Sequence, residues 1–180
     1  MRNELIINAQ GDTVEIALLQ EGKLTELIKD DGNNNFSVGD IYQGKIKKLA
    51  TGLNAAFVDV GYEKDAISTK GPRITSEISL PGRFVVLVPF SDRVSVSQKI
   101  RDRKEKDRLR KIVDGIRPKG FGVIVRTVAM NQSVEDFEQD IDRLMKRWRK
   151  LHRGMKRVKS PARAFSEMSR ASAFLRDVFN

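Results

Sequence analysis

A basic stretch followed by an aromatic one is the first pattern in the sequence that could do chemistry. Lys45, Lys47 and Lys48 stand in an alternating apolar and basic stretch, and Phe57 lies in the apolar stretch that follows. Lysines can follow the phosphates of a nucleic acid while an aromatic ring stacks on a base, as in the OB-type barrels that hold single strands. An aromatic residue in a strand is more often part of a core, so both interpretations of Phe57 stay open on the residues alone.

Arg126 and Thr127 form a second pattern, because they follow the apolar run at residues 123–125. A guanidinium binds phosphate through two parallel hydrogen bonds, and a neighbouring hydroxyl supplies a third donor. Successive side chains of a regular strand point to opposite faces, so both residues can meet one phosphate only if the strand bends or ends at 126–127. Arg-Thr pairs are common, and spacing alone favours an ordinary strand over an anion pocket.

The acidic and histidine residues form no recognisable catalytic or metal-binding pattern. No two carboxylates stand in a motif that would hold Mg²⁺. The acids between residues 135 and 142 are interpreted as the polar surface of a helix, and the single histidine, His152, as a solvated residue within a basic run. The Gly-Lys pairs at 22–23 and 44–45 lack the rest of a Walker A loop. We therefore assign no catalytic residue, metal ligand or cofactor to this chain.

The charge balance favours a polyanionic partner. The 180 residues include 34 Lys and Arg against 24 Asp and Glu, a formal net charge of +10. Such an excess suits RNA, DNA or an anionic membrane face, and a merely basic soluble protein is the alternative. The absence of cysteine excludes disulfides and thiolate zinc sites and favours the cytoplasm. We expect neither a signal peptide nor a membrane span, because no long apolar stretch occurs.

Hydrophobic periodicity predicts a mixed chain of strands and helices. A helix is expected at 99–116, and another begins at Ser133, a good N-cap with Asp136 at the capping-box position. Residues 165–179 are predicted to pass from a strand into a helix. The segments predicted as strands are 4–8, 13–20, 23–29, 41–49, 53–60, 75–80, 84–89, 93–97 and 121–129.

Two stretches resemble the ribonuclease E/G family of bacterial endoribonucleases. They are residues 38–45 (VGDIYQGK) and 52–61 (GLNAAFVDVG), of which the second is highly specific. Later segments agree in the same order, at 70–71, 78–89 and 122–127, so the resemblance runs from residue 4 to residue 180.

The resemblance implies an α+β chain in which an RNase H-like subdomain is split by two insertions. Residues 1–39 would form the first part of that subdomain and residues 159–180 the start of its second segment. An incomplete OB-fold β-barrel that binds RNA would occupy 40–76, and a mixed α/β 5′-sensor subdomain 77–158.

The resemblance also assigns RNA-binding residues. By this comparison, Arg126 and Thr127 match a pocket for the 5′-monophosphate of RNA, and Gly82 and Val86 match its other wall. Phe57 and Lys70 match the aromatic residue and the lysine that contact RNA in the OB fold. With Lys45 and Lys47 from the basic stretch, these are the expected site residues.

The chain departs from the family in two respects. In relatives, the aspartates that bind Mg²⁺ and the cysteines that join subunits through zinc lie beyond the point that corresponds to residue 180. Mg²⁺ is therefore expected in the parent enzyme with ligands outside this chain, and a homo-oligomer would form through the missing C-terminal part. The OB segment is also several tens of residues short, so a five-stranded barrel cannot close. Residues are either deleted or omitted between 66 and 67, and omission is favoured.

Together these features predict the RNA-binding and 5′-monophosphate-sensing N-terminal region of a single-strand-specific endoribonuclease. The parent enzyme would hydrolyse phosphodiester bonds in RNA decay and ribosomal RNA processing, in the cytoplasm. A stand-alone, non-catalytic RNA-binding module is the main alternative. A ribosome-associated structural protein, held by charge alone, is a third interpretation and predicts no preference between RNA 5′ ends.

Binding of single-stranded RNA by this chain should weaken steeply as salt rises, because each phosphate contacted by Lys or Arg releases counterions. We expect a linear fall of the logarithm of the binding constant with the logarithm of salt concentration, measured by fluorescence anisotropy between about 50 and 200 mM salt. An affinity that stays constant over this range would contradict the electrostatic interpretation.

Overall fold

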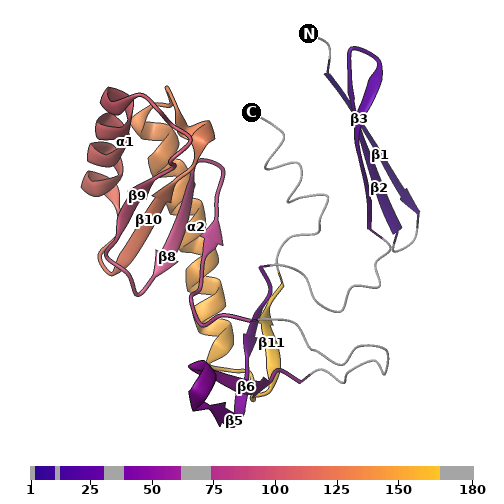
Figure 1. The fold of residues 1–180 in the computed structure, drawn as a ribbon, viewed down its shortest axis with the longest axis vertical. Helices are drawn as coiled ribbons and strands as arrows, with labels where there is room; N and C mark the ends of the chain where they lie inside the picture. The colour runs from indigo at the N-terminus through magenta and orange to yellow at the C-terminus, as the bar shows by residue number, and fades with distance from the viewer. Residues whose placement is uncertain (1–2, 11–12, 31–38, 62–73, 167–180) are drawn as a thin grey trace. The chain divides into compact units, whose positions relative to one another are not determined.

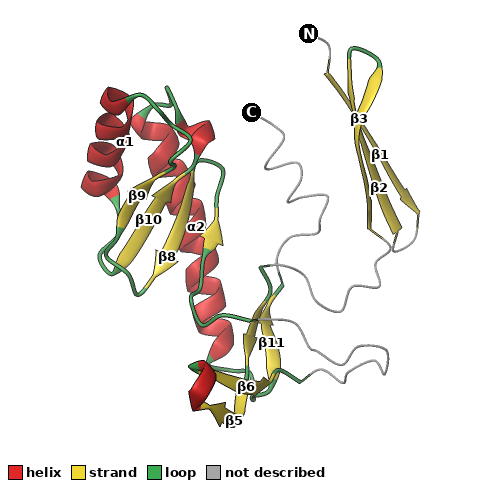
Figure 2. Ribbon diagram, in the orientation of Figure 1, coloured by secondary structure: helices red, strands yellow, loops and turns green. Residues whose placement is uncertain are grey.

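The computed structural model describes residues 3–10, 13–30, 39–61 and 74–166 (Figure 1). Internal contacts divide the chain into two units, one containing residues 1–38 and the other residues 39–166. In the described part of the chain, strands predominate and two α-helices are present (Figure 2), so the predicted α+β class is confirmed. No helix in this part has the length and apolar character needed to cross a membrane.

The first unit contains a three-stranded antiparallel sheet in the order β1-β2-β3. Its strands are β1 (Asn3–Gln10), β2 (Thr13–Gln20) and β3 (Lys23–Asp30), in agreement with the predicted meander. Glu21 and Gly22 join β2 to β3 with φ values of 52° and 77°. Two consecutive left-handed residues are the geometry of a tight hairpin turn, in which glycine is favoured because it has no Cβ.

Two short ribbons stand where an OB-type barrel was expected. Strand β4 (Ile41–Gln43) pairs with β11 (Ala162–Phe165), and β5 (Lys45–Ala50) pairs with β6 (Ala55–Asp59), each antiparallel. No closed barrel is present in the described ranges. The predicted single strand at 41–49 is wrong, because Gly44 separates β4 from β5. A Cβ at Gly44 would collide with the side chain of Val58.

The four predicted domains remain a prediction. Strand β11 lies in the segment assigned to the second RNase H-like part, yet it pairs with β4 from the segment assigned to the OB fold. The expected discontinuity between 66 and 67 lies outside the described residues, as do most of the segments 31–39 and 165–179.

A four-stranded sheet with the order β7-β8-β10-β9 forms the centre of the second unit. Strands β7 (Leu80–Pro81) and β8 (Val85–Pro89) are antiparallel to each other, and β10 (Phe121–Val125) runs antiparallel to β8 but parallel to β9 (Val94–Val96). The predicted strand at 75–80 is wrong except for Leu80. The Thr75 hydroxyl accepts the N–H of Glu77 at 3.2 Å, a local turn that competes with strand pairing.

Both helices begin at side-chain caps. Helix α1 (Arg103–Ile116) starts after Asp102, whose carboxylate accepts the N–H of Lys104 at 2.9 Å, so it begins four residues later than predicted. Helix α2 (Val134–Met155) has the predicted capping box, in which Ser133 and Asp136 each accept the other's backbone N–H. These bonds satisfy amides that have no partner within the helix.

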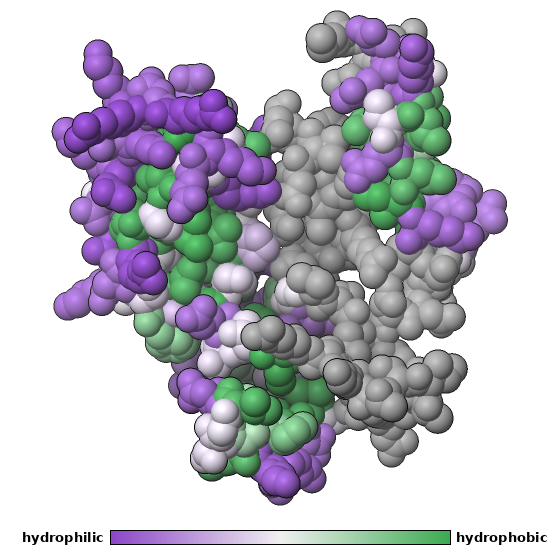
Figure 3. All heavy atoms as spheres, viewed as in Figure 1, coloured by the Kyte–Doolittle hydropathy of each residue, from purple (hydrophilic) through white to green (hydrophobic). Residues whose placement is uncertain are grey.

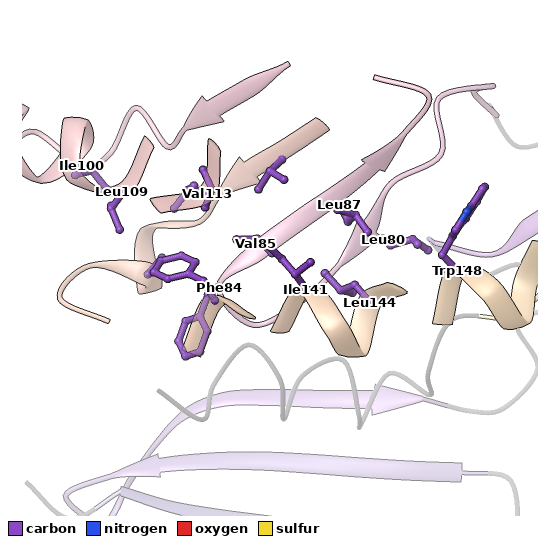
Figure 4. Packing of buried hydrophobic residues seen from close by; sticks show 14 of the residues in the cluster. Leu80, Phe84, Val85, Leu87, Ile100, Leu109, Val113, Ile141, Leu144 and Trp148 are labelled. Carbon is purple, nitrogen blue, oxygen red and sulfur yellow. The ribbon is translucent and has the colours of Figure 1, made fainter. Parts of the chain in front are cut away.

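The hydrophobic core lies between the sheet and the two helices (Figure 4). Alternate residues of β8 and β10 are buried, so one face of the sheet meets the helices, while Val86, Val88 and Ile124 are more accessible on the other. In Figure 3, hydrophobic side chains gather within a hydrophilic border on the visible face of this unit. The buried side chains are Leu80, Phe84, Val85, Leu87, Ile100, Leu109, Val113, Val123, Val125, Ala129, Phe137, Ile141, Leu144, Trp148 and Leu151.

Glu105 and Arg108 of α1 fasten the loop that precedes α2. Both carboxylate oxygens of Glu105 accept from the Arg108 guanidinium at 2.7 Å, and one also accepts the N–H of Asn131 at 3.0 Å. Arg108 in turn donates to the Gln132 carbonyl at 3.2 Å. The Glu105 side chain is only 14% exposed. Hydrogen bonds from Arg108, and then from Asn131, lower the pKa of Glu105 to about 2.

The hydrogen bonds of Glu105 with Arg108 and Asn131, which we call the Glu105 clamp, should make the folding stability fall in acid. A carboxyl group whose pKa is lower in the folded than in the unfolded chain stabilises the fold above the unfolded value of 4.5, and this contribution is lost as the pH falls toward 2. Replacing Glu105→Gln should flatten the dependence of the unfolding free energy on pH between these limits. Urea titrations at several pH values measure it, with Glu138→Gln on the exposed face of α2 as the control. Parallel pH profiles for Glu105→Gln and the wild type would contradict the assignment.

Candidate functional site

Arg126 lies where strand β10 ends. Its backbone is extended, with φ −81° and ψ 162°, and the next three residues form a 3-10 turn (Thr127–Ala129). The predicted strand terminus at 126–127 is therefore confirmed, and the predicted strand at 121–129 is too long. The chain leaves the sheet at the turn 127–129, so β10 does not extend beyond Arg126.

A turn between β7 and β8 lies against Arg126. The Gly82 N–H donates to the Val85 carbonyl at 2.8 Å and closes the turn. The Arg126 N–H donates to the Phe84 carbonyl at 2.8 Å, and its guanidinium Nη1 donates to the carbonyls of Gly82 at 2.8 Å and Arg83 at 3.3 Å. The structure thus brings together Arg126 and Gly82, as predicted, through the glycine's carbonyl.

Asp140 of α2 holds the same turn from the other side. The carboxylate accepts the backbone N–H groups of Arg83, Phe84 and Val85 at 3.2, 2.8 and 3.2 Å, and the residue is only 4% exposed. A Cβ on Gly82 would lie 2.5 Å from a carboxylate oxygen of Asp140, so glycine is required for this close approach.

The interpretation of all acids between 135 and 142 as surface is therefore wrong for Asp140. A signal was available in the sequence, because Asp140 follows Phe137 by three residues and precedes Leu144 by four. Residues three and four apart share a helix face, so this carboxylate belongs to the buried side. A buried carboxylate is tolerated where hydrogen bonds replace its hydration, and three amides do so here.

Thr127 engages a different neighbour. Its hydroxyl lies 3.0 Å from the Ser97 hydroxyl, and the Ser97 N–H donates to the Val125 carbonyl at 2.9 Å. Ser97 directly follows β9, which is parallel to β10, so the two strands end at the same edge of the sheet. Sequence reasoning missed Ser97, because no local motif shows which strands are parallel neighbours.

Val86 lies one step inside the sheet from this edge. It pairs with Ile124 on one side and with Pro81 on the other, and its side chain is half-buried on the face turned away from the helices. The end of the sheet carries the Arg126 guanidinium on the side of β8 and the hydroxyls of Thr127 and Ser97 on the side of β9. Guanidinium and hydroxyl groups donate hydrogen bonds, so this edge suits an anion.

The basic ribbon places its aromatic residue in solvent. Phe57 is 63% exposed, so it is not a core residue. Its registered partner across the ribbon is Lys48, and an irregularity between Ile46 and Lys48 displaces Lys47 from the ladder. Among the three lysines of the ribbon, Lys48 is therefore the one opposite Phe57.

The other two lysines of the ribbon lie near Asp59. The Lys47 ammonium is 3.2 Å from the Asp59 carboxylate, and Lys45 is paired with Asp59 in the register of the ribbon. Hydrogen bonds from the Gly61 N–H, and then from Lys47, lower the pKa of Asp59. The predicted RNA contact Lys70 lies outside the described residues.

Comparison with known proteins identifies the family. A family profile described as the ribonuclease E/G family matches residues 79–180. The chain belongs to the ribonuclease E/G family. It is 28% identical to Ribonuclease E of Nostoc sp. over 99% of this chain and 31% of that relative. It is 28% identical to Ribonuclease G of Salmonella typhimurium over 98% of this chain and 45% of that relative, and 27% identical to Ribonuclease G of Escherichia coli with the same coverage.

Two facts about length follow from these comparisons. The chain spans less than half of each of these ribonucleases, between 31% and 45%. The alignments extend over 217 to 222 residues, whereas the chain has 180, so some residues of these relatives have no counterpart in it.

Gly82→Ala should destabilise the unit that contains the site. The new methyl group would meet the Asp140 carboxylate, and overpacking of this kind costs about 1–3 kcal/mol. Gly115→Ala is the matched control, because Gly115 lies in α1 with open space around it, and alanine in a helix is neutral or stabilising by up to about 1 kcal/mol. Thermal denaturation followed by circular dichroism measures both changes. Equal midpoints for the two variants would show that the turn at 82–85 accommodates a side chain.

Proposed function

We propose that this chain binds single-stranded RNA and senses a 5′-monophosphate at the sheet edge formed by Arg126, Thr127, Ser97 and Gly82. The observation that carries the proposal is the Arg126 guanidinium, held beside the turn at 82–85 at the end of a strand. Backbone carbonyls already fix the direction of this guanidinium, so it loses little rotamer freedom when it binds a ligand. This favours the binding of a phosphate in one geometry.

The hydroxyls beside Arg126 support a phosphate rather than a carboxylate-rich peptide as the ligand. The hydroxyls of Thr127 and Ser97 lie 3.0 Å apart, so one hydroxyl donates to the other, and the hydroxyl that accepts keeps its own proton to donate to an oxygen that approaches the pair. A terminal phosphate has three oxygens and accepts from several donors at once, whereas a 5′-hydroxyl carries no charge. The proposed site therefore distinguishes the two kinds of RNA end.

The ribbon of β5 and β6 would contact the RNA chain away from its end. Phe57 offers an exposed ring for a base, and Lys48 beside it offers a charge for the adjacent phosphate. Lys45, Lys47 and Lys70 complete the proposed basic surface. The relatives are named as ribonucleases, which supports RNA as the polyanion over DNA or a membrane.

In this proposal the chain is the N-terminal region of a single-strand-specific endoribonuclease of the cytoplasm, in RNA decay and ribosomal RNA processing. The described residues include no cluster of three or more acidic or histidine side chains that could hold a metal ion. The resemblance to the family, rather than that absence, is the ground for proposing that Mg²⁺ and the groups that cleave the phosphodiester are held by residues outside this chain, where a homo-oligomer would also form.

Arg126→Ala should abolish the preference for 5′-monophosphorylated RNA. Hydrogen bonds to charged groups contribute about 1.5–3 kcal/mol, so the ratio of affinities for 5′-monophosphate and 5′-hydroxyl RNA should fall tenfold or more. Fluorescence anisotropy with two otherwise identical oligonucleotides measures the ratio.

Arg110→Ala removes the same charge from the exposed face of α1 and should leave the ratio unchanged. An Arg126→Ala variant that loses affinity equally for both RNAs would assign Arg126 to the fold instead. In a full-length enzyme with this substitution, cleavage of circular RNA should change little, since no 5′ end is involved.

A further inference from the structure

Phe90 is exposed and held in an unfavourable backbone conformation. It directly follows β8, its side chain is 81% exposed, and its φ is +61°. Its N–H donates to the Gly120 carbonyl at 3.0 Å, which fixes the turn in this geometry. A bulky residue with positive φ is uncommon, and such strain is concentrated at functional sites. Packing of the Phe90 side chain does not offset this strain, because most of the ring faces solvent.

Phe90 belongs to an aromatic cluster that we define as Phe90, Phe121, Trp148 and His152. The Trp148 ring packs edge-on against Phe90, with 5.6 Å between ring centroids, and against Phe121 at 5.9 Å. His152, one turn further along α2, lies 5.8 Å from Trp148 with the rings tilted by 33°. Trp148 is only 7% exposed, so it supports the cluster from below while Phe90 and His152 face solvent.

Two arginines stand beside the aromatic cluster. Arg149 and Arg153 line a shallow hollow together with Trp148 and His152. The Arg153 Nε donates to the Arg149 carbonyl at 3.2 Å, which keeps Arg153 on the helix surface. Among the described residues, no carboxylate lies within ion-pair distance of either guanidinium. Asp142, which lies earlier on α2, pairs with Lys146 at 2.7 Å.

This hollow is separate from the proposed 5′-phosphate site. Phe121 begins strand β10 and Arg126 follows its end, so five residues of extended chain, roughly 16 Å, separate the two. Phe90 follows β8, which runs antiparallel to β10, and Phe121 pairs with Pro89, so Phe90 lies at the Phe121 end of the sheet. One phosphate cannot contact Arg126 and the aromatic cluster together.

We propose that the aromatic cluster and the hollow beside it bind an unpaired nucleobase of single-stranded RNA, which stacks on Phe90 or His152, with an adjacent phosphate against Arg149 and Arg153. The inference rests on the proposed function only in taking RNA as the ligand. Stacking on an exposed ring with a cation nearby holds single strands without regard to sequence, because every base has a π-face. Arginines beside the rings, neither of them in an ion pair with a carboxylate of the described residues, favour this polyanion over an apolar protein surface. The site thereby contacts RNA independently of the chemistry of its 5′ end.

The single tryptophan of the chain makes the proposal directly measurable. Trp148 is the only tryptophan in the sequence and supports the aromatic cluster, so a base bound there should change its fluorescence. A 5′-hydroxyl oligouridine is the probe, since it bypasses the 5′-phosphate site, and the full 180-residue chain is the protein. We expect saturable quenching of Trp148 by this RNA. Oligouridine containing 4-thiouridine should form photo-crosslinks that map to Phe90 or to the 148–153 segment.

Variants of Phe90 separate stacking from general apolar contact. Phe90→Ala and Phe90→Leu should each weaken oligouridine binding by about fivefold or more, whereas Phe90→Tyr should bind as the wild type does. Ile124→Ala, on the accessible face of the same sheet, is the matched control and should bind normally. If Phe90→Ala unfolds, the exposed pair Arg149→Gln and Arg153→Gln tests the same site. The double variant should lower the salt slope by roughly 0.7, the value for one phosphate of a single strand.

Three outcomes would overturn the proposal. They are unchanged oligouridine binding in both the Phe90 and the arginine variants, crosslinks that map only elsewhere, and self-association that Phe90→Ala abolishes without any change in RNA affinity. The last would assign the hollow to a second copy of the chain. Failure here is distinguishable from failure of the proposed function. Phe90→Ala should weaken 5′-monophosphate and 5′-hydroxyl RNA equally, whereas Arg126→Ala should change only their ratio.

Discussion

The carboxylate of Asp140 determines the shape of the turn between β7 and β8, and the geometry around Arg126 depends on that turn. Its three hydrogen bonds to backbone N–H groups orient residues 83–85, and this leaves the carbonyls of Gly82 and Arg83 directed toward the guanidinium. A buried carboxylate is costly unless such donors replace water, so the turn and the helix stabilise each other. The absence of a side chain at Gly82 is part of the same constraint, because the carboxylate occupies the space of a Cβ.

The hydrophobic core holds the end of the sheet, and with it the turn at 82–85 and Arg126, in a fixed position. Alternate residues of β8 and β10 are buried against α1 and α2, and close-packed interiors resist small displacements. Parallel pairing of β9 with β10 then brings Ser97 beside Thr127, while the Glu105 clamp holds the loop at 131–132. Residues 82–85, 97, 126–127 and 140 thus meet at one end of the sheet, and the side-chain hydrogen bonds that join them link residues far apart in the sequence.

The sequence predicted the parts of this arrangement that depend on local pattern. The meander of the first unit, the capping box at Ser133 and the strand end at 126–127 follow from turn chemistry, helix capping and strand alternation. Contacts that depend on tertiary placement were missed, such as Ser97. The pairing of Phe57 with Lys48 depends on a register irregularity, and one extra residue in a strand changes every later pair. The error at Asp140 was different, because its helical spacing already placed it on the buried face.

Charge and geometry contribute differently to recognition by this chain. A net charge of +10 attracts any polyanion, and counterion release makes that attraction dependent on salt but indifferent to the chemistry of the RNA end. Discrimination requires donors that are fixed before the ligand arrives, because mobile lysines adapt to whatever phosphate is near. Arg126 is fixed by carbonyls on a turn that Asp140 holds, whereas Lys45 and Lys48 are exposed on a two-stranded ribbon. In the proposed function, selectivity for an RNA end would therefore come from the packed sheet, and general affinity from the exposed basic surfaces.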